Sequence, residues 1–474
     1  MKCISWSVII VSLILSSQLL AEWGELGDLT LEDKLFGLSL IWKEADYNYP
    51  HFDQLKDLDW DEEYKSFISR VSDTDNIYDY YRQIQEFTAL LQDCHTRVIF
   101  PPPFSEMLDY PLVMLKWIEG RVIVSNVGDK YAESLPIGSQ ILQVDGIEVE
   151  EYLNEQVLPF ISASNEAVLY NKAMSMFFFG ERDSEVRVKF RFPPTDIIAS
   201  ETEERTGEVV LTRSRRNDRW SEIIDTREEL LYTRWLDLDE EIYYVAIWSF
   251  HDELILRYFE TILDELQRCS GLIIDLRENR RGRIEISNEI LKYLTEKEIL
   301  TGTTMESRKN IALYRAWGTP VAMYQYLPPE EFVPFGTGDA WHREEPLRIE
   351  NDPDRVKITV PLVILTDSET SMAAEDFLVA LLSARDDVKI VGTHTAGSRG
   401  QALIHQLPGG GYAWITTHRD IYGDDKILSR TGIEPDFIVE QSYLDYLQER
   451  DPVLEKGELI IREMLEERAD QKSD

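Results

Sequence analysis

The segment at residues 271–282 reads GLIIDLRENRRG, from Gly271 to Gly282. Its first six residues are apolar except for one aspartate, which is typical of a strand that is buried on both faces of a sheet. A similar strand, turn and helix pattern recurs at residues 242–266 and 360–378. Repeated strand–helix units favour a layered α/β domain with right-handed crossovers. Ligands of such domains bind at the carboxyl ends of the strands, so we expect the loops at residues 277–282 and 367–372 to meet there.

Two further domains are expected before this α/β core. Residues 22–105 carry three amphipathic helical stripes, and Thr30 is the expected N-cap of the first helix. Residues 106–200 contain alternating and apolar strand patterns joined by Glu-Gly and Asp-Gly turns. Residues 201–240 are polar at first and predict a linker or a hairpin insertion, and residues 241–474 form the core.

The composition excludes several classes of protein. Of 474 residues, 43% are hydrophobic, which is enough to build buried cores and excludes a disordered chain. The chain has 49 Lys and Arg against 88 Asp and Glu, a net charge of −39. This acidity argues against a nucleic-acid binder and against docking on an anionic membrane. It favours solubility.

Residues 1–21 predict a secretory signal peptide. Lys2 is followed by an apolar stretch at residues 4–14 and by a small residue, Ala21, at the expected cleavage site. We therefore expect an exported protein, periplasmic or extracellular, with no membrane span after signal removal. An uncleaved membrane anchor is the alternative. Cys94 and Cys269 would then remain, which makes neither a disulfide framework nor a zinc pattern; two buried free thiols are favoured over a pair.

Six segments, in this order along the chain, resemble motifs of one enzyme family. They are residues 91–96 (LQDCHT), 136–147, 271–282, 365–377, 391–400 and 432–436 (GIEPD). In this order they resemble the tail-specific or C-terminal processing serine peptidases, especially the tricorn-like branch.

The resemblance implies a multidomain α/β fold: a helical N-terminal cap, a PDZ-like β domain and a crotonase-like α/β peptidase core. It also implies a chemistry without metal or cofactor. A serine at a strand-to-helix elbow attacks a peptide carbonyl, a His or Lys takes its proton, and backbone N–H groups hold the oxyanion. The implied partner is a peptide or an unfolded protein.

The residues at the implied catalytic positions depart from the family pattern. The nucleophile position is Met372, whose thioether has no proton to lose, and Ser371 stands one residue before it. The family's Asn-Gly-Gly-Gly oxyanion loop ends here in Arg280, Arg281 and Gly282. Arginines there could bind a carboxylate or could be solvated and paired with local acids.

Two other positions bear on the same chemistry. The family's late acidic residue corresponds to Ser429, whereas His95 is retained from the catalytic set. His95 is either a base or a structural residue that caps the preceding helix. Cys94 is a poor substitute nucleophile, because neighbouring side chains diverge.

Three hypotheses follow from these departures. The first is a pseudopeptidase that binds an extended peptide or an apolar small ligand. The second is an active serine-type endopeptidase in which Ser371 works with His95, and the Gly282 and Ala373 N–H groups hold the oxyanion. The third is a non-hydrolytic enzyme on the crotonase-like core, which no motif in the sequence supports.

Overall fold

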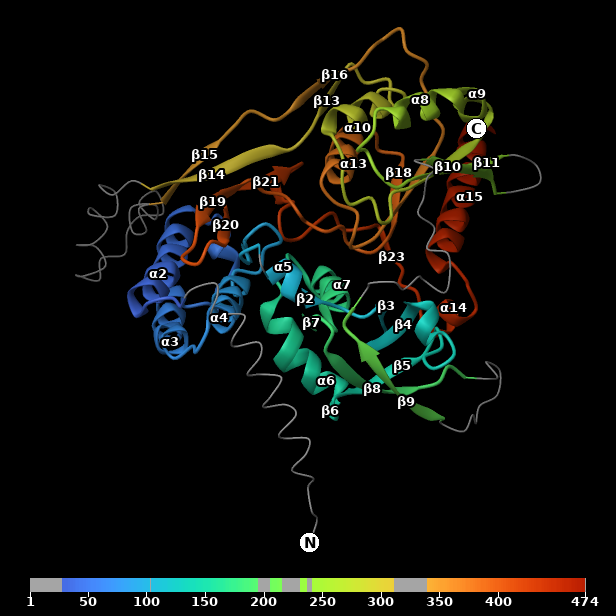
Figure 1. The fold of residues 1–474 in the computed structure, drawn as a ribbon. Coiled ribbons are helices and arrows are strands. Elements are labelled where there is room, and N and C mark those ends of the chain that lie inside the picture. The colour runs from blue at the N-terminus through green and yellow to red at the C-terminus, as the bar shows by residue number, and fades with distance from the viewer. Residues whose placement is uncertain are drawn as a thin grey trace.

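The computed structural model describes residues 28–102, 104–194, 205–214, 231–236, 241–310 and 339–473. The expected signal peptide lies outside these residues. The fold is multidomain α/β, with a helical N-terminal part, a β-rich domain and a larger α/β core (Figure 1). In the part of the chain described, no helix is both long enough and apolar enough to cross a membrane.

The core is built on one six-stranded sheet. Five strands run parallel, and the edge strand β10 is antiparallel to its neighbour. In spatial order the strands are β10 (Leu231–Trp235), β11 (Ile242–Ile247), β12 (Gly271–Asp275), β17 (Leu362–Thr366), β18 (Val388–Gly392) and β23 (Phe437–Ile438). All residues of β11, β12 and β17 are buried, which confirms the prediction made from their continuous apolar runs.

Helices cover both faces of this sheet. One face packs against α8 (Leu254–Thr261), α9 (Leu263–Arg268), α10 (Ile284–Leu291) and α13 (Ala373–Ala384). The other packs against α15 (Pro452–Ser473) through Ile460 and Ile461. Beside the core, β13 (Ile299–Thr301) pairs with β16 (Arg348–Glu350), and a second sheet joins β15 (Asp339–Arg343), β14 (Thr304–Asn310), β21 (His418–Tyr422) and β22 (Lys426–Ile427).

The N-terminal helices contain residues from the opposite end of the chain. Helices α2 (Leu31–Asn48), α3 (Trp60–Ser72) and α4 (Ile77–Ala89) form as predicted, and Thr30 caps α2 in a capping box with Asp33. Strand β1 (Arg97–Ile99) then pairs with β20 (Tyr412–Thr416), which pairs with β19 (Ala402–Gln406). Figure 1 shows these late strands beside the blue helices. Part of the segment assigned to the core from sequence therefore completes the N-terminal domain.

The PDZ-like domain is a curved sheet with one main helix. Its strands are β3 (Val113–Ile118), β4 (Arg121–Val127), β5 (Gln140–Val144), β8 (Glu185–Arg191) and β9 (Thr206–Thr212), with β6 (Ile147–Glu148) added beside β5. Helix α7 (Glu166–Met176) packs on β3. The two predicted turns are confirmed, since Glu119-Gly120 and Asp145-Gly146 all have positive φ.

The described residues of the range 201–240 contribute strands to both neighbouring sheets. The sequence predicted a linker or a hairpin insertion there. In the described parts of this range, β9 pairs with β8 as a hairpin along its whole length, and β10 pairs with β11 of the core sheet. The domains therefore meet between β9 and β10. The alternation in β9, where Val209 and Leu211 are buried and Glu208 is exposed, is short and follows a polar stretch that dominated the prediction.

Candidate functional site

Met372 occupies a sharp turn between β17 and α13. It is the N-cap of α13, with φ 55° and ψ −117°, a conformation that residues with a Cβ rarely adopt. A strained strand-to-helix turn is the geometry of a nucleophile elbow, in which the residue at the turn is presented to the cleft. The Met372 side chain is 39% exposed. The turn is thus present, but the side chain that it presents has no proton to give up and cannot form an acyl-enzyme.

Ser371 is held inside the loop next to the elbow. It is only 7% exposed, and its N–H donates to the Asn279 carbonyl at 3.0 Å. Its Oγ donates to the Arg280 carbonyl at 3.0 Å. No hydrogen bond joins Ser371 to His95 in the part of the chain that the structure describes. The Ser371 hydroxyl therefore stabilises the contact between the two loops.

The loop that corresponds to the oxyanion loop is fixed by its glycine and its asparagine. A Cβ on Gly282 would lie 2.4 Å from Phe250 Cβ and 2.7 Å from Phe250 Cα, so this position requires glycine. Buried Asn279 donates through Nδ2 to the Ile247 carbonyl at 2.9 Å. Arg280 and Arg281 are exposed, and Arg280 forms an ion pair with Glu369. Of the two alternatives given above for these arginines, Arg280 therefore follows the second, pairing with an acidic side chain nearby.

Glu375, which the sequence analysis did not single out, ties the elbow to the neighbouring loop. It is fully buried and is the third residue of α13, after Ala373 and Ala374. Its Oε1 accepts from Thr395 Oγ1 and Gly397 N, both at 2.7 Å, and its Oε2 accepts from Met372 N at 3.2 Å. Burial raises the pKa of Glu375 to about 7, against the donors that lower it. A glutamate three residues after an N-cap is a capping-box signal that could have revealed this role.

His95 lies in the loop between α4 and β1. Its Nδ1 is buried and has no hydrogen-bond partner among the described residues. Burial is the main reason that the pKa of His95 is lowered, so the ring is neutral near pH 7. The loop is held by Asp93, whose Oδ2 accepts from Thr96 Oγ1 at 2.6 Å and Thr416 Oγ1 at 2.5 Å.

The other candidates have structural surroundings. Cys94 is a buried free thiol that packs with Ala163, Val168 and Ala396, and Cys269 is also free and buried. Ser429 is buried, and its Oγ accepts from the Asp420 N–H at 2.9 Å. In the described ranges, no three His, Cys, Asp or Glu side chains gather in a way that could hold a metal ion.

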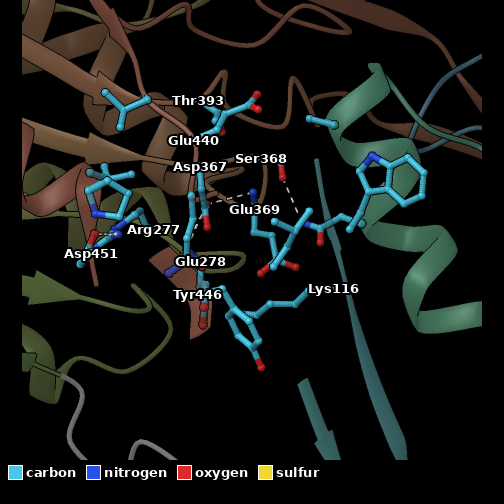
Figure 2. Close-up of a pocket in the computed structure, with 18 of the residues that line it drawn as sticks. Lys116, Arg277, Glu278, Asp367, Ser368, Glu369, Thr393, Glu440, Tyr446 and Asp451 are labelled. Carbon is cyan, nitrogen blue, oxygen red and sulfur yellow. Dashed lines mark hydrogen bonds and ion pairs between the residues drawn. The ribbon is translucent and has the colours of Figure 1, made fainter. Parts of the chain in front are cut away.

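A cleft of about 930 Å³ opens at the carboxyl ends of the core strands, between the core and the PDZ-like domain (Figure 2). Sequence reasoning predicted this edge but not the cleft, because its walls come from distant segments. They include β3 and α7, the ends of β12 and β17, and the chain around α14 (Tyr443–Leu447). Its lining includes Lys116, Trp117, Ile118, Glu119, Glu166, Tyr170, Trp248, Asp275, Arg277, Glu278, Asp367, Ser368, Glu369, Glu440, Tyr446, Glu449, Arg450 and Asp451.

The cleft shares a loop with the elbow. Asp367, Ser368 and Glu369 line the cleft, and Met372 follows three residues after Glu369. Arg277 crosses one wall, where it binds Asp275 at 2.6 Å and Asp451 at 2.7 Å. These two carboxylates raise the pKa of Arg277, although burial lowers it. The Arg277 guanidinium therefore stays protonated, and the two carboxylates balance its charge.

Comparisons with known proteins agree with the sequence resemblance. No curated protein sequence matches the chain. Among solved structures, mature CPAF complexed with lactacystin is similar at a TM-score of 0.65 and 15% identity, over 92% of this chain and 97% of that chain. A putative peptidase from Parabacteroides merdae is similar at a TM-score of 0.51 and 18% identity, over 92% and 97%. At these identities the similarity shows the fold.

The family of the core follows from a sequence profile. The matched segment runs from the residue before β11 to the residue after β23, so it includes the elbow and the oxyanion-type loop. The recognition made from the motifs is confirmed by this match and by the shared fold. Residues 241–439 of this chain match the model of peptidase family S41.

Proposed function

We propose that this chain is an exported pseudopeptidase that binds extended peptide segments without cutting them. The observation that carries the proposal is Met372 at the elbow, with φ 55°, where covalent catalysis needs a hydroxyl or thiol. The signal-like N-terminus is the reason for including export.

The β3 edge supports peptide binding. Among the described residues, β3 pairs only with β4 and stands at the end of its sheet. Three consecutive residues of β3, from Lys116 to Ile118, line the cleft, and α7 packs beside them. An extended peptide could add to this edge by main-chain hydrogen bonds, with its side chains in the cleft. The many charged lining residues disfavour the alternative of an apolar small ligand.

Ser371 does not offer a replacement nucleophile in this geometry. Its hydroxyl is buried and donates to the Arg280 carbonyl, and it makes no hydrogen bond to His95 in the described structure. Activation of serine requires a base within hydrogen-bond reach. The second hypothesis would therefore need a rearrangement of both loops.

The test combines covalent labelling with binding. Mature protein is incubated with a fluorophosphonate probe and with denatured casein, beside an active serine peptidase as positive control. We expect neither labelling nor casein degradation, while labelled unstructured peptides bind in fluorescence anisotropy. Labelling that disappears in both Ser371→Ala and His95→Ala would overturn the proposal and establish a shifted Ser–His enzyme.

A further inference from the structure

Strand β19 lies at the edge of the three-stranded sheet β1-β20-β19 and, among the described residues, pairs only with β20. The Gln401 carbonyl accepts from the Thr417 N–H at 3.1 Å, so positions 401 and 417 form a hydrogen-bonded pair. Such pairs alternate with non-hydrogen-bonded pairs along an antiparallel ladder. The N–H and C=O groups of Ala402, Ile404 and Gln406 therefore point away from β20, and no hydrogen bond occupies them in the described structure.

This edge lacks the features that usually keep an exposed strand from pairing. Soluble proteins protect such edges with charged side chains, with proline or with a bulge. The five residues of β19 include neither a charged residue nor a proline, and their register with β20 is unbroken. Leu403 is 42% exposed and Ile404 is 57% exposed. The open backbone groups are therefore accompanied by two exposed apolar side chains.

The distribution of charge favours a second copy of this chain as the partner. Each copy has a net charge of −39, so two copies repel each other unless their contact surfaces avoid charge. Residues 400–418 contain no Asp, Glu, Lys or Arg, whereas these four types make up 29% of the chain. Glu44, a carboxylate that approaches β19, pairs with Lys43 at 2.9 Å and lies 3.6 Å from His405 Nε2. Two copies can therefore meet at β19 without opposing carboxylates.

We propose that this chain forms a two-fold dimer by antiparallel pairing of β19 with β19 of a second copy, centred on Ile404. The open backbone groups at positions 402, 404 and 406 are spaced symmetrically about Ile404. A two-fold axis there matches each open N–H with a C=O of the other copy. The two sheets then become one six-stranded sheet in the order β1-β20-β19-β19-β20-β1. This dimer does not depend on peptide binding.

The side chains on the outer face of β19 fit this arrangement. Directly paired residues share a face of the sheet, so Ile404 lies in one row with Trp414 and Arg97. The Arg97 guanidinium lies 4.8 Å from the Trp414 ring centroid. The row thus runs from a charge on β1 to an apolar end on β19, and the dimer joins two such rows at their apolar ends. The isoleucine pair formed there covers the most exposed apolar side chain of the strand.

Sedimentation equilibrium of the mature chain measures the dimer, and we expect twice the mass of one chain at micromolar concentration. Ile404→Lys places two like charges opposite each other and should raise the dimer dissociation constant about 10-fold or more. Ile404→Pro removes an N–H that points away from β20, so it should also weaken the dimer while the β19–β20 hydrogen bonds remain. Val210→Lys, at a 43% exposed position of the edge strand β9, is the matched control and should keep the wild-type constant.

Cysteine substitution tests the register of the pairing. Ile404→Cys brings two thiols opposite each other, where Cα atoms about 5.5 Å apart suit a disulfide. Mild oxidation of this variant should therefore give a dimer band that disappears with reductant. Gln406→Cys is the control and should give none, because position 406 of the two copies stands four residues apart along the strands, about 14 Å. The native Cys94 and Cys269 are buried and should not cross-link.

Three results would overturn the proposal. They are a monomer mass throughout the micromolar range, a dimer that Ile404→Lys and Ile404→Pro leave unchanged, and equal cross-linking of the two cysteine variants. Circular dichroism of each variant separates loss of the dimer from loss of the fold. If the lysine and proline variants do not fold, the pair of cysteine variants decides.

Discussion

At residue 372 the chain forms the sharp turn of a nucleophile elbow, although the methionine side chain cannot act as a nucleophile. A positive φ at a residue with a Cβ costs about 1–3 kcal/mol, and Met372 has φ 55°. The hydrogen bonds that fix the turn involve other side chains and backbone groups: Met372 N donates to Glu375, and Ser371 N donates to the Asn279 carbonyl. The surrounding loops therefore impose the elbow, and any side chain at position 372 would be presented in the same way.

The first prediction concerns reversal of this residue. Met372→Ser should fold and place a hydroxyl at the elbow, yet it should not degrade denatured casein. Ser429, which the motif alignment places at the family's late acid, accepts a hydrogen bond from the Asp420 N–H, and the Arg280 carbonyl accepts one from Ser371 Oγ. Loss of one oxyanion donor alone costs about 10²–10³ in rate.

Casein turnover and fluorophosphonate labelling of the Met372→Ser protein check this prediction, with Met372→Ala as the matched control. Turnover well above that of the alanine variant would show that the oxyanion loop still functions.

The second prediction uses the buried Glu375 carboxyl. Its folded pKa of about 7 lies above its ordinary 4.5, so the folded state holds the proton more tightly. The stability from this group is therefore fully present below pH 4.5 and is lost as pH rises through 7. Between pH 5.5 and pH 8 the loss is about 2 kcal/mol. Glu375→Gln has no proton to lose, so this part of the pH dependence should vanish.

Urea unfolding of the wild type and Glu375→Gln at the two pH values measures the difference. Glu208→Gln, at an exposed position, should follow the wild type at both. Parallel pH dependence of Glu375→Gln and the wild type would contradict the raised pKa.

At the scale of elements, the sequence predicted what local patterns control. Continuous apolar runs predicted β11, β12 and β17. The Glu119-Gly120 and Asp145-Gly146 dipeptides predicted two turns, and these residues have positive φ in the structure. The helix predicted after β11 is divided into α8 and α9 at Ile262, which a stripe of apolar residues does not reveal. The union of β1 with β20 joins residues more than 300 positions apart, and no local pattern records such pairing.

The candidate site also has parts that the sequence predicts and parts that it does not. Six motifs in order were enough to expect Met372 at the elbow, because the elbow is one continuous segment. The cleft could not be predicted, because β3, α7 and the chain around α14 meet only in three dimensions. Glu375 was passed over because carboxylates are abundant in this acidic chain. Its importance comes from complete burial.

The third prediction tests how the hairpin of β19 and β20 is attached to the N-terminal helices. The Tyr81 hydroxyl is buried, donates to the Pro408 carbonyl and accepts from Gly411 N, both at 2.8 Å. Tyr81→Phe leaves both backbone groups without this partner and should lower the free energy of unfolding by about 2 kcal/mol. Tyr47→Phe is the control, because the Tyr47 side chain is 57% exposed. Chemical denaturation that shows equal effects for the two variants would argue that the hairpin is not held by this residue.

At the scale of the whole molecule, charge and domain arrangement act together. The chain carries a net charge of −39, and the cleft between the PDZ-like domain and the core concentrates carboxylates at one place. A high net charge keeps a protein soluble but opposes its compact state, and a cleft lined by one sign of charge attracts the opposite sign. The same charges should therefore weaken folding and favour the approach of a basic peptide.

The last prediction follows from the opposite signs of these two effects. Raising NaCl from 10 to 500 mM shortens the Debye length from about 30 Å to less than 8 Å. Screening relieves self-repulsion, so the melting temperature should rise over this range. The association rate of a pentapeptide that contains arginine should instead fall about 10-fold or more. Stopped-flow anisotropy and thermal unfolding in matched buffers measure the two trends. The same pentapeptide with citrulline in place of arginine lacks the cation, so its association rate should change little. An arginine association rate that does not depend on salt would mean that the carboxylates of the cleft do not steer the peptide, whatever they contribute once it is bound.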